Sequence, residues 1–523
     1  MIQKRTLSAD DAARLMLFAA VIFGLCFRIV PAWIAGFPIN DGGLFHTMIL
    51  DLQANHYRLP NYTTYNNLNI PFAYPPAGFY ISAIMGDLFH IPPLELLRWL
   101  PGIINTLSIP ALYIFAHEIT NNRMQSAISA FVLAMTPHLF AWLSMGGGLT
   151  RSLGVTFMIL TLTCLYRLFT LGTRNSLIGS IIFGSLVVLS HTEAPIYTMA
   201  VAVYIWFMKS RSTQGMLKGG LVTLGVLIVC SPWYGMVLYR HGMDPLLSAL
   251  QTGSHSTQSI FRLLNLDFMT EEPYIDLLGV IGLLGMAILI ARKEYFIPGM
   301  MLVIFVSLPR SAHTIGNIPS AIAAGYFVAA VLLPAMERLW GTNSGEKHHL
   351  LAFVIVLIPY LFSNSAQYAL LLSGKHVGPG ERAAMQWAQA NTDETSKFIV
   401  LTGEENPFCD ASSEWFPSIT GRTSLNTLQG REWLLGGEFG RFIANTRKLQ
   451  ACTTQGMDCL TPMLSYFGSE YDYIFISQAA STKDCQATDP SNRTMPDLAA
   501  AIEDAEGHSV VYRSDDVVIF KHE

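Results

Sequence analysis

Long apolar runs recur along most of the chain. A helix of about twenty apolar residues crosses the hydrocarbon core of a bilayer. Runs of that kind occupy 15–34, 74–90, 99–116, 125–143, 152–171, 177–190, 195–208, 219–238, 275–291, 295–308, 319–336 and 350–372. Charged residues make up 13% of the chain, against about 25% in a soluble domain. The sequence therefore predicts a multi-span α-helical membrane protein with about 12 to 13 transmembrane helices. The first run is too long for a cleaved signal peptide, so we expect it to remain as an anchor.

Positively charged residues indicate which ends of the spans face the cytoplasm. They precede the first span and fill later turns: Lys4, Arg5, Arg14, Arg167, Arg174, Lys209, Arg211, Lys218, Arg292, Lys293, Arg338 and Lys347. From these charges we expect the segments 35–73, 191–195, 240–274, 309–318 and everything after 373 to face outward. The plasma membrane of a prokaryote is the predicted location.

This orientation conflicts with the number of runs. An even number of spans places both termini on one side, whereas the charges place the N-terminus inside and the segment after 373 outside. We therefore expect a missing, split or re-entrant crossing between 90 and 150. The stretch MTPHLFAWLSMGGGLTR, which Pro137 and three glycines interrupt, is the predicted place.

The chain changes character after residue 372, where apolar runs shorten and charged residues return. KFIVLTG, YDYIFIS and SVVYRSDDVVIFK have the pattern of strands, and GERAAMQWAQA and PDLAAAIEDA have that of helices. Alternating strands and helices predict a soluble α/β domain with a largely parallel sheet. We divide the chain into a transmembrane domain, 1–372, with its first outer loop at 35–73, and an extracytoplasmic domain, 373–523.

The cysteines fall into two groups. Cys26, Cys164 and Cys230 lie in predicted spans, where a thiol behaves as a small apolar group. The C-terminal domain holds Cys409, Cys452, Cys459 and Cys485. Four cysteines on an outward side favour two disulfides over zinc, because no C-x2-C spacing is present. Three pairings are possible, and we favour Cys452 with Cys459, which leaves Cys409 with Cys485.

A carboxylate follows the first span, in FPINDGGLFHTM. The next residues predict an amphipathic helix in the membrane interface. Asp41 could be only the N-cap of this helix, but Asn40 could cap it equally well. Gly42 and Gly43 favour a functional role, because glycines let a ligand approach the backbone. A carboxylate at the rim of a bilayer is costly unless it is used or paired. We predict that Asp41 is a catalytic base, with Asn40 and His46 among the substrate-binding residues.

The loop that follows, NYTTYNNLNIPFAYPPAGFY, is dense in Asn and Tyr and almost free of charge. Such side chains suit the hydroxyl groups of a sugar, and Tyr74 is a candidate for substrate binding. A polar interfacial loop with the usual aromatic belt is the alternative interpretation, and composition does not separate the two.

These features together resemble the GT-C superfamily of integral-membrane glycosyltransferases. The resemblance rests on the acidic residue past the first span, on YPPAGFY opening the next run, on the outward C-terminal domain, and on GGGLTRSLG, LSHTEAP, PRSAHTIGNIPSAIAAGY and SEWFPSITGRTSLNTLQGREW. It implies a polyprenyl-phosphate-linked sugar donor, inversion at the anomeric carbon, and an acceptor activated by the acidic residue. The superfamily often has two adjacent acids or Asp-x-Asp where this chain has Asn40-Asp41, a departure that weakens the case for a metal.

Transfer from such a donor needs a cation near the leaving phosphate. Arg310 and His313, in LPRSAHTIGN, lie at the predicted outer end of a span. Arg310 suits a phosphate through two parallel hydrogen bonds, although snorkelling to lipid headgroups is equally compatible. Arg151 is a second candidate. His191 and Glu193, in LSHTEAP, lie at the outer end of another span. Glu193 is predicted to assist the base or to bind a metal with Asp41, and the alternative is that the pair simply fixes the helix end.

In the outer domain, DASSEWFPSITGRTSL follows a predicted strand, as binding loops do. Trp415 and Arg422 are predicted to bind the acceptor, and packing between domains is the alternative. The long polar loop at 240–274 has the character of a substrate-gating loop.

The predicted activity is that of a membrane glycosyltransferase acting at the outer face. Its expected partners are the polyprenyl-phosphate sugar, a glycan or protein acceptor and membrane lipids. The net charge of −5 gives no nucleic-acid footprint. No cofactor is assigned, and a divalent cation such as Mg²⁺ or Mn²⁺ is left open. The alternative function is a transporter or lipid flippase, but no internal repeat is found and ionisable residues within the spans are few.

Overall fold

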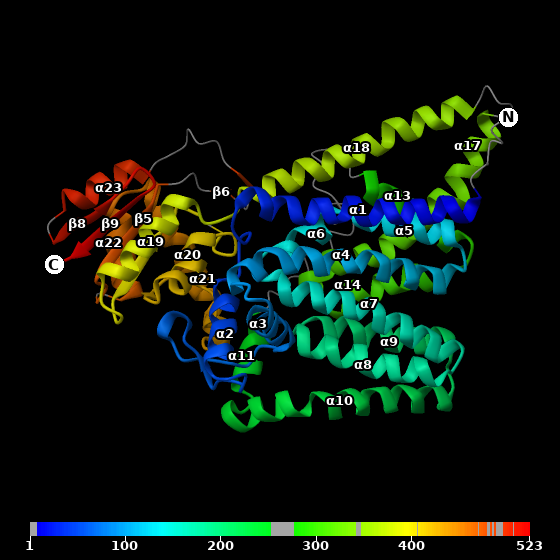
Figure 1. Cartoon of the computed structure of the whole chain (residues 1–523), viewed down its shortest axis with the longest axis horizontal. Helices are drawn as coiled ribbons and strands as arrows, with labels where there is room; N and C mark the ends of the chain where they lie inside the picture. The colour runs from blue at the N-terminus through cyan, green and yellow to red at the C-terminus, as the bar shows by residue number, and fades with distance from the viewer. Residues whose placement is uncertain are drawn as a thin grey trace.

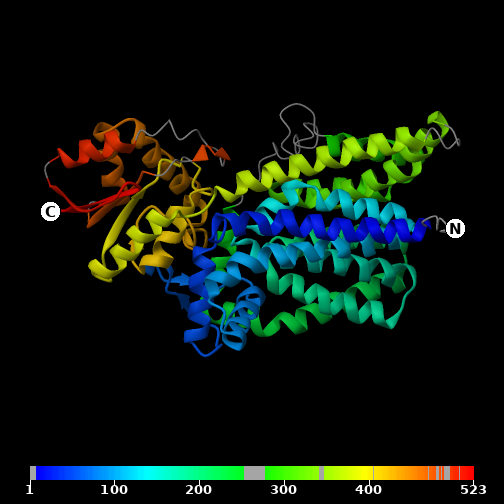
Figure 2. The same ribbon diagram turned by 45° about the horizontal axis from the view of Figure 1, so that its top comes forward.

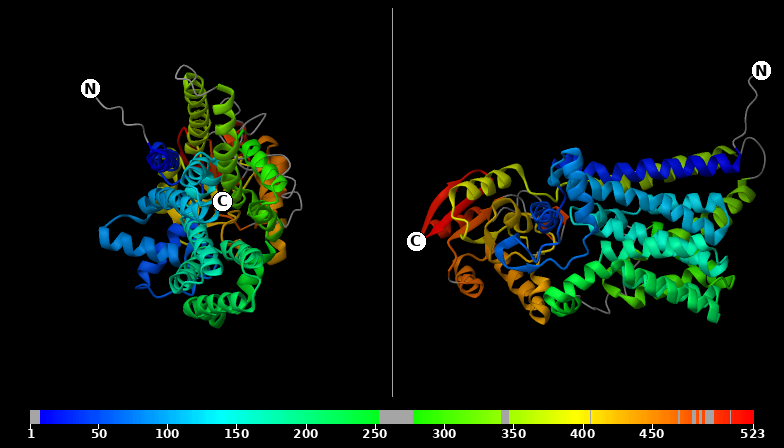
Figure 3. Two further views of the ribbon diagram at one scale, coloured as in Figure 1. Left: turned by 90° about the vertical axis from the view of Figure 1, so that its right-hand side faces the viewer. Right: turned by 60° about the horizontal axis from the view of Figure 1, so that its bottom comes forward.

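The computed structural model describes residues 8–252, 277–340, 347–404, 406–468, 470–478, 482–483, 486–487, 495–505 and 507–523. An elongated bundle of helices carries a sheet domain at one end (Figure 1). The start of α1 lies at the other end, as a second view also shows (Figure 2). Seen along the bundle, most of the helices appear roughly end-on, so their axes lie close to parallel (Figure 3, left). The two ends of the bundle therefore differ, because the sheet domain covers only one of them.

The bundle contains long apolar helices with shorter ones between them. Its helices are α1 (Ala9–Ala35), α4 (Pro93–Thr120), α5 (Arg123–Ala134), α6 (Pro137–Ser144), α7 (Gly148–Thr170), α8 (Arg174–Ser190), α9 (Ala194–Lys209), α10 (Thr213–His241), α13 (Leu277–Ala291), α14 (Phe296–Ser307), α16 (Asn317–Phe327), α17 (Leu333–Trp340) and α18 (Lys347–Ser373). In the described part of the chain, 5 helices are long and apolar enough to cross a membrane, or up to 6 if the bent pair α5 and α6 is one span.

One predicted span is not a span. The run 74–90 forms α3 (Ala77–Phe89), which has 13 residues and lies beside α2 at the sheet-domain end (Figure 1). At 1.5 Å per residue it is about 20 Å long, too short for a hydrocarbon core of about 30 Å. The crossing that the sequence expected to be missing, split or re-entrant between 90 and 150 corresponds to the bent pair α5 and α6, which is a broken span or a re-entrant loop.

The apolar run 125–143 is interrupted where the sequence predicted. The helices α5 and α6 meet at an angle of 56°, because Pro137 cannot donate the hydrogen bond that would continue the helix. Side chains from other helices bind the carbonyl groups that the break leaves open. Arg28 Nη1 donates to the carbonyl of Ala134 (3.1 Å), and Ser365 Oγ donates to that of Met135 (2.8 Å). Arg28 is 1% exposed, so a buried arginine stabilises the break.

The segment between α1 and α4 lies at the sheet-domain end. It contains α2 (Gly43–Ala54), the paired strands β1 (Tyr62–Thr63) and β2 (Ile70–Pro71), and α3. Its asparagines have a backbone role, because Asn66, Asn67 and Asn69 take positive φ angles of 58°, 51° and 53°, which asparagine tolerates better than most residues. The side chain of Asn66 also bonds the backbone of Ser424 in both directions, at 3.0 and 2.6 Å. These asparagines shape the loop and attach it to the sheet domain.

The sheet domain begins after α18 with α19 (Pro379–Asn391). Its five-stranded sheet has the order β4-β3-β5-β9-β8, from β3 (Lys397–Leu401), β4 (Thr423–Ser424), β5 (Tyr473–Ser477), β8 (His508–Arg513) and β9 (Val517–His522). The strand β3 pairs in parallel with β4 and β5. The predicted strand SVVYRSDDVVIFK is instead the hairpin β8–β9, since the tight turn between its halves permits only antiparallel pairing. The α/β class is confirmed, and the sheet is mixed.

Helices pack on this sheet. They are α20 (Ala411–Thr420), α21 (Phe439–Ala451), α22 (Met457–Phe467) and α23 (Met495–Glu503), with short 3-10 turns at Arg431–Trp433 and Gly436–Glu438. The small pair β6 (Thr482–Lys483) and β7 (Gln486–Ala487) lies outside the main sheet. Of these elements, α20 faces the bundle and contacts α2.

One of the predicted disulfides is confirmed. Cys452 and Cys459 are bonded, with their Cα atoms 5.2 Å apart. Cys409 is also disulfide-bonded. Cys485, its predicted partner, lies outside the described residues, so that second pairing stays a prediction. The three bundle cysteines are free thiols.

Mass mapping of the non-reduced protein should show no free thiol among the four cysteines of the sheet domain. The physical reason is that disulfides persist only in an oxidising compartment, so the experiment also tests on which side of the membrane this domain lies. After denaturation, the thiols of Cys26, Cys164 and Cys230 should alkylate and serve as the internal control. Alkylation of all four sheet-domain cysteines without reductant would contradict both the second disulfide and the outward side.

Candidate active site

Asp41 lies in the short loop between α1 and α2, at the sheet-domain end of the bundle. Its Oδ2 atom is 2.5 Å from Nη2 of Arg151, and its Oδ1 atom accepts a hydrogen bond from the backbone N–H of Gly147 at 3.0 Å. Asp41 does not cap α2, whose N-cap is Gly42 with no side-chain hydrogen bond. The carboxylate faces the N-terminus of α7, where the helix dipole favours negative charge.

Glycines permit this close approach. A Cβ atom at Gly147 would lie 2.5 Å from Asp41 Oδ2, and one at Gly146 would lie 2.1 Å from the Asp41 carbonyl oxygen. A Cβ atom at Gly43 would meet the carbonyl oxygen of Glu414 at 2.5 Å. Side chains at these positions would therefore push apart the loop, α7 and α20. The sequence analysis expected a ligand to approach the backbone at Gly43, but the backbone of Glu414 in α20 occupies that space.

A second ion pair lies at the same end of the bundle. Arg310 Nε is 3.5 Å from Glu193 Oε1, and Ser311 Oγ donates to Glu193 Oε2 at 2.6 Å. Glu193 precedes the first residue of α9, and Arg310 lies in the 3-10 turn Pro309–Ser311 after α14. The side chain of Arg310 is 43% exposed, so part of the guanidinium stays accessible while one edge faces a carboxylate.

Electrostatic contacts connect the two ion pairs. His191, the C-cap of α8, lies close enough to Glu193, Arg151 and Arg310 for their charges to interact with its ring. Tyr74 lies within range of Arg151 and Glu193 and is 3.3 Å from the Thr150 hydroxyl. The structure therefore brings Asp41, Glu193 and Arg310, which are far apart in sequence, to one region. A cavity shared by all three stays a prediction.

The sheet domain contributes two further acids that the sequence did not single out. Glu414, in α20, is 4% exposed and accepts a hydrogen bond from the Gly42 N–H at 2.8 Å. Burial, and then the charge of Asp41, raises the pKa of Glu414 well above its ordinary value. Burial also raises the pKa of Glu432 to about 7, and Arg310 acts on it in the opposite direction.

The remaining candidates from the membrane domain lie close by. Asn40 is 1% exposed, and its side-chain Nδ2 donates to the Phe408 carbonyl at 3.0 Å. His46 Nδ1 lies 2.9 Å from the Ser418 hydroxyl, and burial lowers the pKa of His46 to about 4. His313 stands edge-on to the ring of His138, with centroids 6.2 Å apart. Substrate contact stays a prediction for these residues.

Trp415 and Arg422 have structural contacts. Trp415 is 0% exposed, and its Nε1 donates to the Asn40 carbonyl at 2.9 Å. The Arg422 guanidinium donates to the carbonyl groups of Gln389 and Thr392, each at 2.7 Å, and so fixes the end of α19. These contacts show that both side chains pack within the protein, as the alternative interpretation expected. Binding of an acceptor by Trp415 and Arg422 stays a prediction.

A metal ion fits this arrangement poorly. No group of three or more His, Cys, Asp or Glu side chains gathers as a metal site in the parts of the chain that the structure describes. Both oxygens of Asp41 already accept N–H groups, so a cation would have to displace Arg151. We assign no step of the reaction to a metal.

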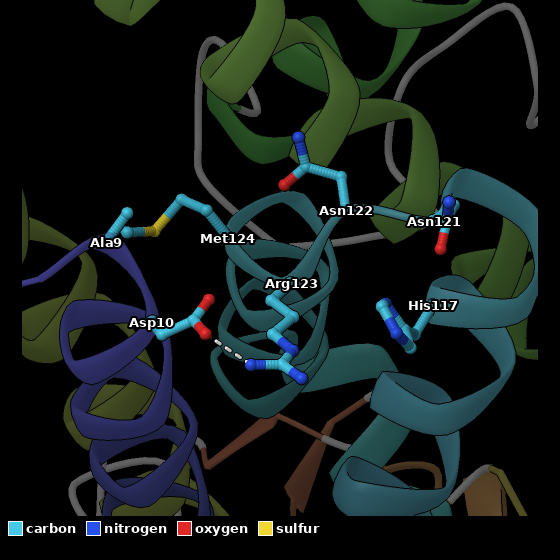
Figure 4. Close-up of a pocket in the computed structure, with 7 residues that line it drawn as sticks. All are labelled: Ala9, Asp10, His117, Asn121, Asn122, Arg123 and Met124. Atoms are coloured by element: carbon cyan, nitrogen blue, oxygen red, sulfur yellow. Dashed lines mark hydrogen bonds and ion pairs between the residues drawn. The ribbon is translucent and has the colours of Figure 1, made fainter.

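Two of the pockets on the described surface lie away from these residues. One, of about 390 Å³, lies at the end of the bundle away from the sheet domain, where Asp10 and Arg123 form an ion pair beside His117 (Figure 4). The other, of about 520 Å³, is lined by Gln53, Asp87 and His90 among others. Neither includes Asp41, Glu193 or Arg310, so the groove expected for a lipid tail stays a prediction.

Comparison with known proteins decides the fold. The family model described as dolichyl-phosphate-mannose-protein mannosyltransferase matches residues 73–235. A solved structure of ArnT from Cupriavidus metallidurans, bound to undecaprenyl phosphate, matches with a TM-score of 0.56 and 15% identity, over 98% of each chain. The fold is that of the GT-C membrane glycosyltransferases. The GT-C fold accounts for the helical bundle and for the domain at one end.

Two further comparisons match glycosyl-transferring proteins of the archaeon Archaeoglobus fulgidus. The oligosaccharyltransferase AglB from Archaeoglobus fulgidus, solved with an inhibitory peptide and a dolichol-phosphate, has a TM-score of 0.55 and 14% identity, over 98% of this chain and 74% of that one. Dolichyl-phosphooligosaccharide-protein glycotransferase 1 of the same organism is 27% identical over 160 residues, which are 28% of this chain and 26% of that relative. The chain thus matches about a quarter of the length of this curated relative.

Proposed function

We propose that the protein is an inverting membrane glycosyltransferase. It takes a sugar from a polyprenyl-phosphate donor and transfers it to a hydroxyl or amide group of a glycan or protein acceptor, at the outer face where the sheet domain lies. One observation carries the proposal: Asp41 is held between Arg151 and the N-terminus of α7, close to a second cation–acid pair, Arg310 with Glu193. The GT-C fold and the lipid phosphates named for two solved structures of that fold support it.

The chemistry follows from a base on one side of the anomeric carbon and cations on the other. The Asp41 carboxylate takes the acceptor proton as the acceptor atom bonds to the anomeric carbon. The bond from that carbon to the phosphate oxygen breaks, and its electron pair leaves with the polyprenyl phosphate. Arg310, which is partly exposed, stabilises the charge on that phosphate. Attack opposite the leaving group inverts the configuration.

Arg151 lies on the same side as the base and has a donor that Asp41 does not use. Its Nη2 is bonded to Asp41, while its Nε is buried with no hydrogen-bond partner among the described residues. An unpaired buried donor is costly, and an oxygen of the incoming acceptor or of the sugar would satisfy it. Arg151 therefore orients the base and faces the substrate.

The decisive experiment incubates the purified protein in detergent with a panel of radiolabelled polyprenyl-phosphate sugars. Acceptor-dependent release of polyprenyl phosphate from at least one donor is the expected result. The anomeric configuration of the product, determined by NMR, tests inversion. Solute flux in proteoliposomes without release of polyprenyl phosphate would overturn the proposal in favour of a transporter or flippase.

Arg310→Ala should weaken donor binding as well as rate, because the phosphate is present before the transition state. We expect a rise in the donor KM and a fall in kcat of about 10-fold or more each. Steady-state kinetics with varied donor measures both. Arg441→Ala, at an arginine whose side chain is 72% exposed on the sheet domain, is the control. A normal donor KM in Arg310→Ala would remove the phosphate assignment and leave the role of Asp41 intact.

A further inference from the structure

Both chain neighbours of Asp41 are held by the sheet domain. The Gly42 N–H donates to Glu414 Oε1 at 2.8 Å, and the Trp415 indole donates to the Asn40 carbonyl at 2.9 Å. Adjacent residues of α20 thus bond the residues immediately before and after the proposed base. Asp41 itself is left free to point its side chain at α7.

The side chains that make these contacts are buried. Trp415 and Glu414 are 0% and 4% exposed. The Glu414 carbonyl oxygen accepts the hydroxyl of Tyr65 at 2.6 Å and occupies the space beside Gly43 that a side chain would need. Glu414 therefore uses both its side chain and its backbone to bind the segment around the base.

The opposite side of the loop rests on the start of α7. The Gly146 N–H donates to the Ile39 carbonyl at 2.9 Å, and the Gly147 N–H donates to the Asp41 carbonyl at 3.2 Å. The loop is clamped between two elements, the N-terminus of α7 in the bundle and α20 in the sheet domain. The helix α20 bonds both of the residues that flank Asp41, and the start of α7 bonds Ile39 and Asp41 itself.

We propose that Glu414, together with Trp415, is a positioning residue of the glycosyl transfer: it holds the Asp41 loop against α7 so that the carboxylate faces the acceptor. This inference rests on the proposed function. Positioning matters because a displacement of about 1 Å in a reacting group can lower a rate about 100-fold. The sheet domain is, on this account, a structural part of the catalytic centre.

The role needs a hydrogen-bond acceptor at Glu414 and no negative charge. Burial raises the pKa of Glu414 well above its ordinary value, as do the charges of Asp41 and Glu432, while Arg151 and the Gly42 N–H act the other way. Glutamine keeps the acceptor oxygen and the size of the side chain, so it should replace glutamate here.

The test compares Glu414→Ala with Glu414→Gln in the full-length protein. Glu414→Ala should lower kcat about 10- to 100-fold with the donor KM within about threefold of wild type, and Glu414→Gln should restore most of the loss. Ser412→Ala is the matched control, because it removes a hydrogen bond between α20 and Glu381 inside the sheet domain and should leave kcat close to wild type. Hydrogen exchange of the peptide spanning 37–48, followed by mass spectrometry, should be faster in Glu414→Ala and unchanged in Ser412→Ala.

A folded Glu414→Ala protein with wild-type kcat and exchange would overturn the inference, as would Glu414→Gln being as slow as Glu414→Ala. If Glu414→Ala does not fold, Trp415→Phe replaces it, since this change removes the donor to Asn40 together with part of the buried ring. Wild-type kcat and exchange in Trp415→Phe would also overturn the inference. If the wild-type protein transfers no sugar but hydrogen exchange responds as expected, the proposed function is wrong. The structural part of the inference, that Glu414 holds the Asp41 loop against α7, is then still supported.

Discussion

Asp41→Asn should abolish sugar transfer while the protein folds and still binds its donor. A positioned general base contributes about 10²- to 10⁴-fold to a rate, so kcat should fall within that range or further. Asparagine keeps the size of the side chain and an oxygen for the Gly147 N–H, and removes the basic oxygen that faces Arg151. Release of radiolabelled polyprenyl phosphate measures the rate, and retention of donor by the detergent-purified variant measures binding.

Asp51→Asn is a suitable control for the loss of a carboxylate in the same region. Asp51 lies in α2 and accepts hydrogen bonds from the Thr63 hydroxyl at 2.6 Å and from the Thr64 hydroxyl at 2.7 Å. It holds the loop to the helix and does not contact Asp41. We expect Asp51→Asn to reduce stability and to retain transfer. Near-normal turnover in Asp41→Asn would end the assignment of Asp41 as the base.

Arg151→Gln should lower kcat by about 10²- to 10³-fold, which is the cost of removing one preorganised donor from an active site. The change leaves a partly buried carboxylate without its cation, since the Asp41 and Arg151 side chains are 17% and 25% exposed. The two residues act as a unit, so Asp41→Asn combined with Arg151→Gln should be little slower than the slower single variant. Kinetics of the two single variants and the double variant measure this coupling.

Arg98→Gln controls for the loss of an arginine at this end of the bundle. Arg98 pairs with Glu95 and donates to the Ala32 carbonyl at 3.0 Å, away from the proposed site. Its replacement should leave kcat close to wild type. Additive losses in the double variant of Asp41 and Arg151 would show that the arginine acts on the substrate independently of the base.

The membrane class and the presence of a C-terminal α/β domain follow from the sequence, because hydrophobicity and its period are local properties. The error at 74–90 has a physical cause. A half-buried helix at the end of a bundle needs apolar residues as much as a spanning one does, and only its length of 13 residues separates the two. The break at Pro137 was predictable because proline removes a specific hydrogen bond.

Only some residues of the candidate site could be predicted from the sequence. Asp41, Glu193 and Arg310 could be chosen because each follows an apolar run, where charge is expensive. Arg151 could be noticed but not placed until the run before it was oriented. Glu414 carried no such signal, since it lies in a soluble domain where acids are common. Its importance comes from a contact with Gly42 across 372 residues of sequence, which no local pattern reports.

That separation has a consequence for biosynthesis. The Asp41 loop is made early, when the first helix enters the membrane, and α20 is made after the whole bundle. Domains generally fold in the order in which they are synthesised, so the bundle is inserted while the loop still lacks the partner that holds it. On the proposed function, the Asp41 loop is therefore held in its catalytic position only after the sheet domain has been made and has folded onto that loop.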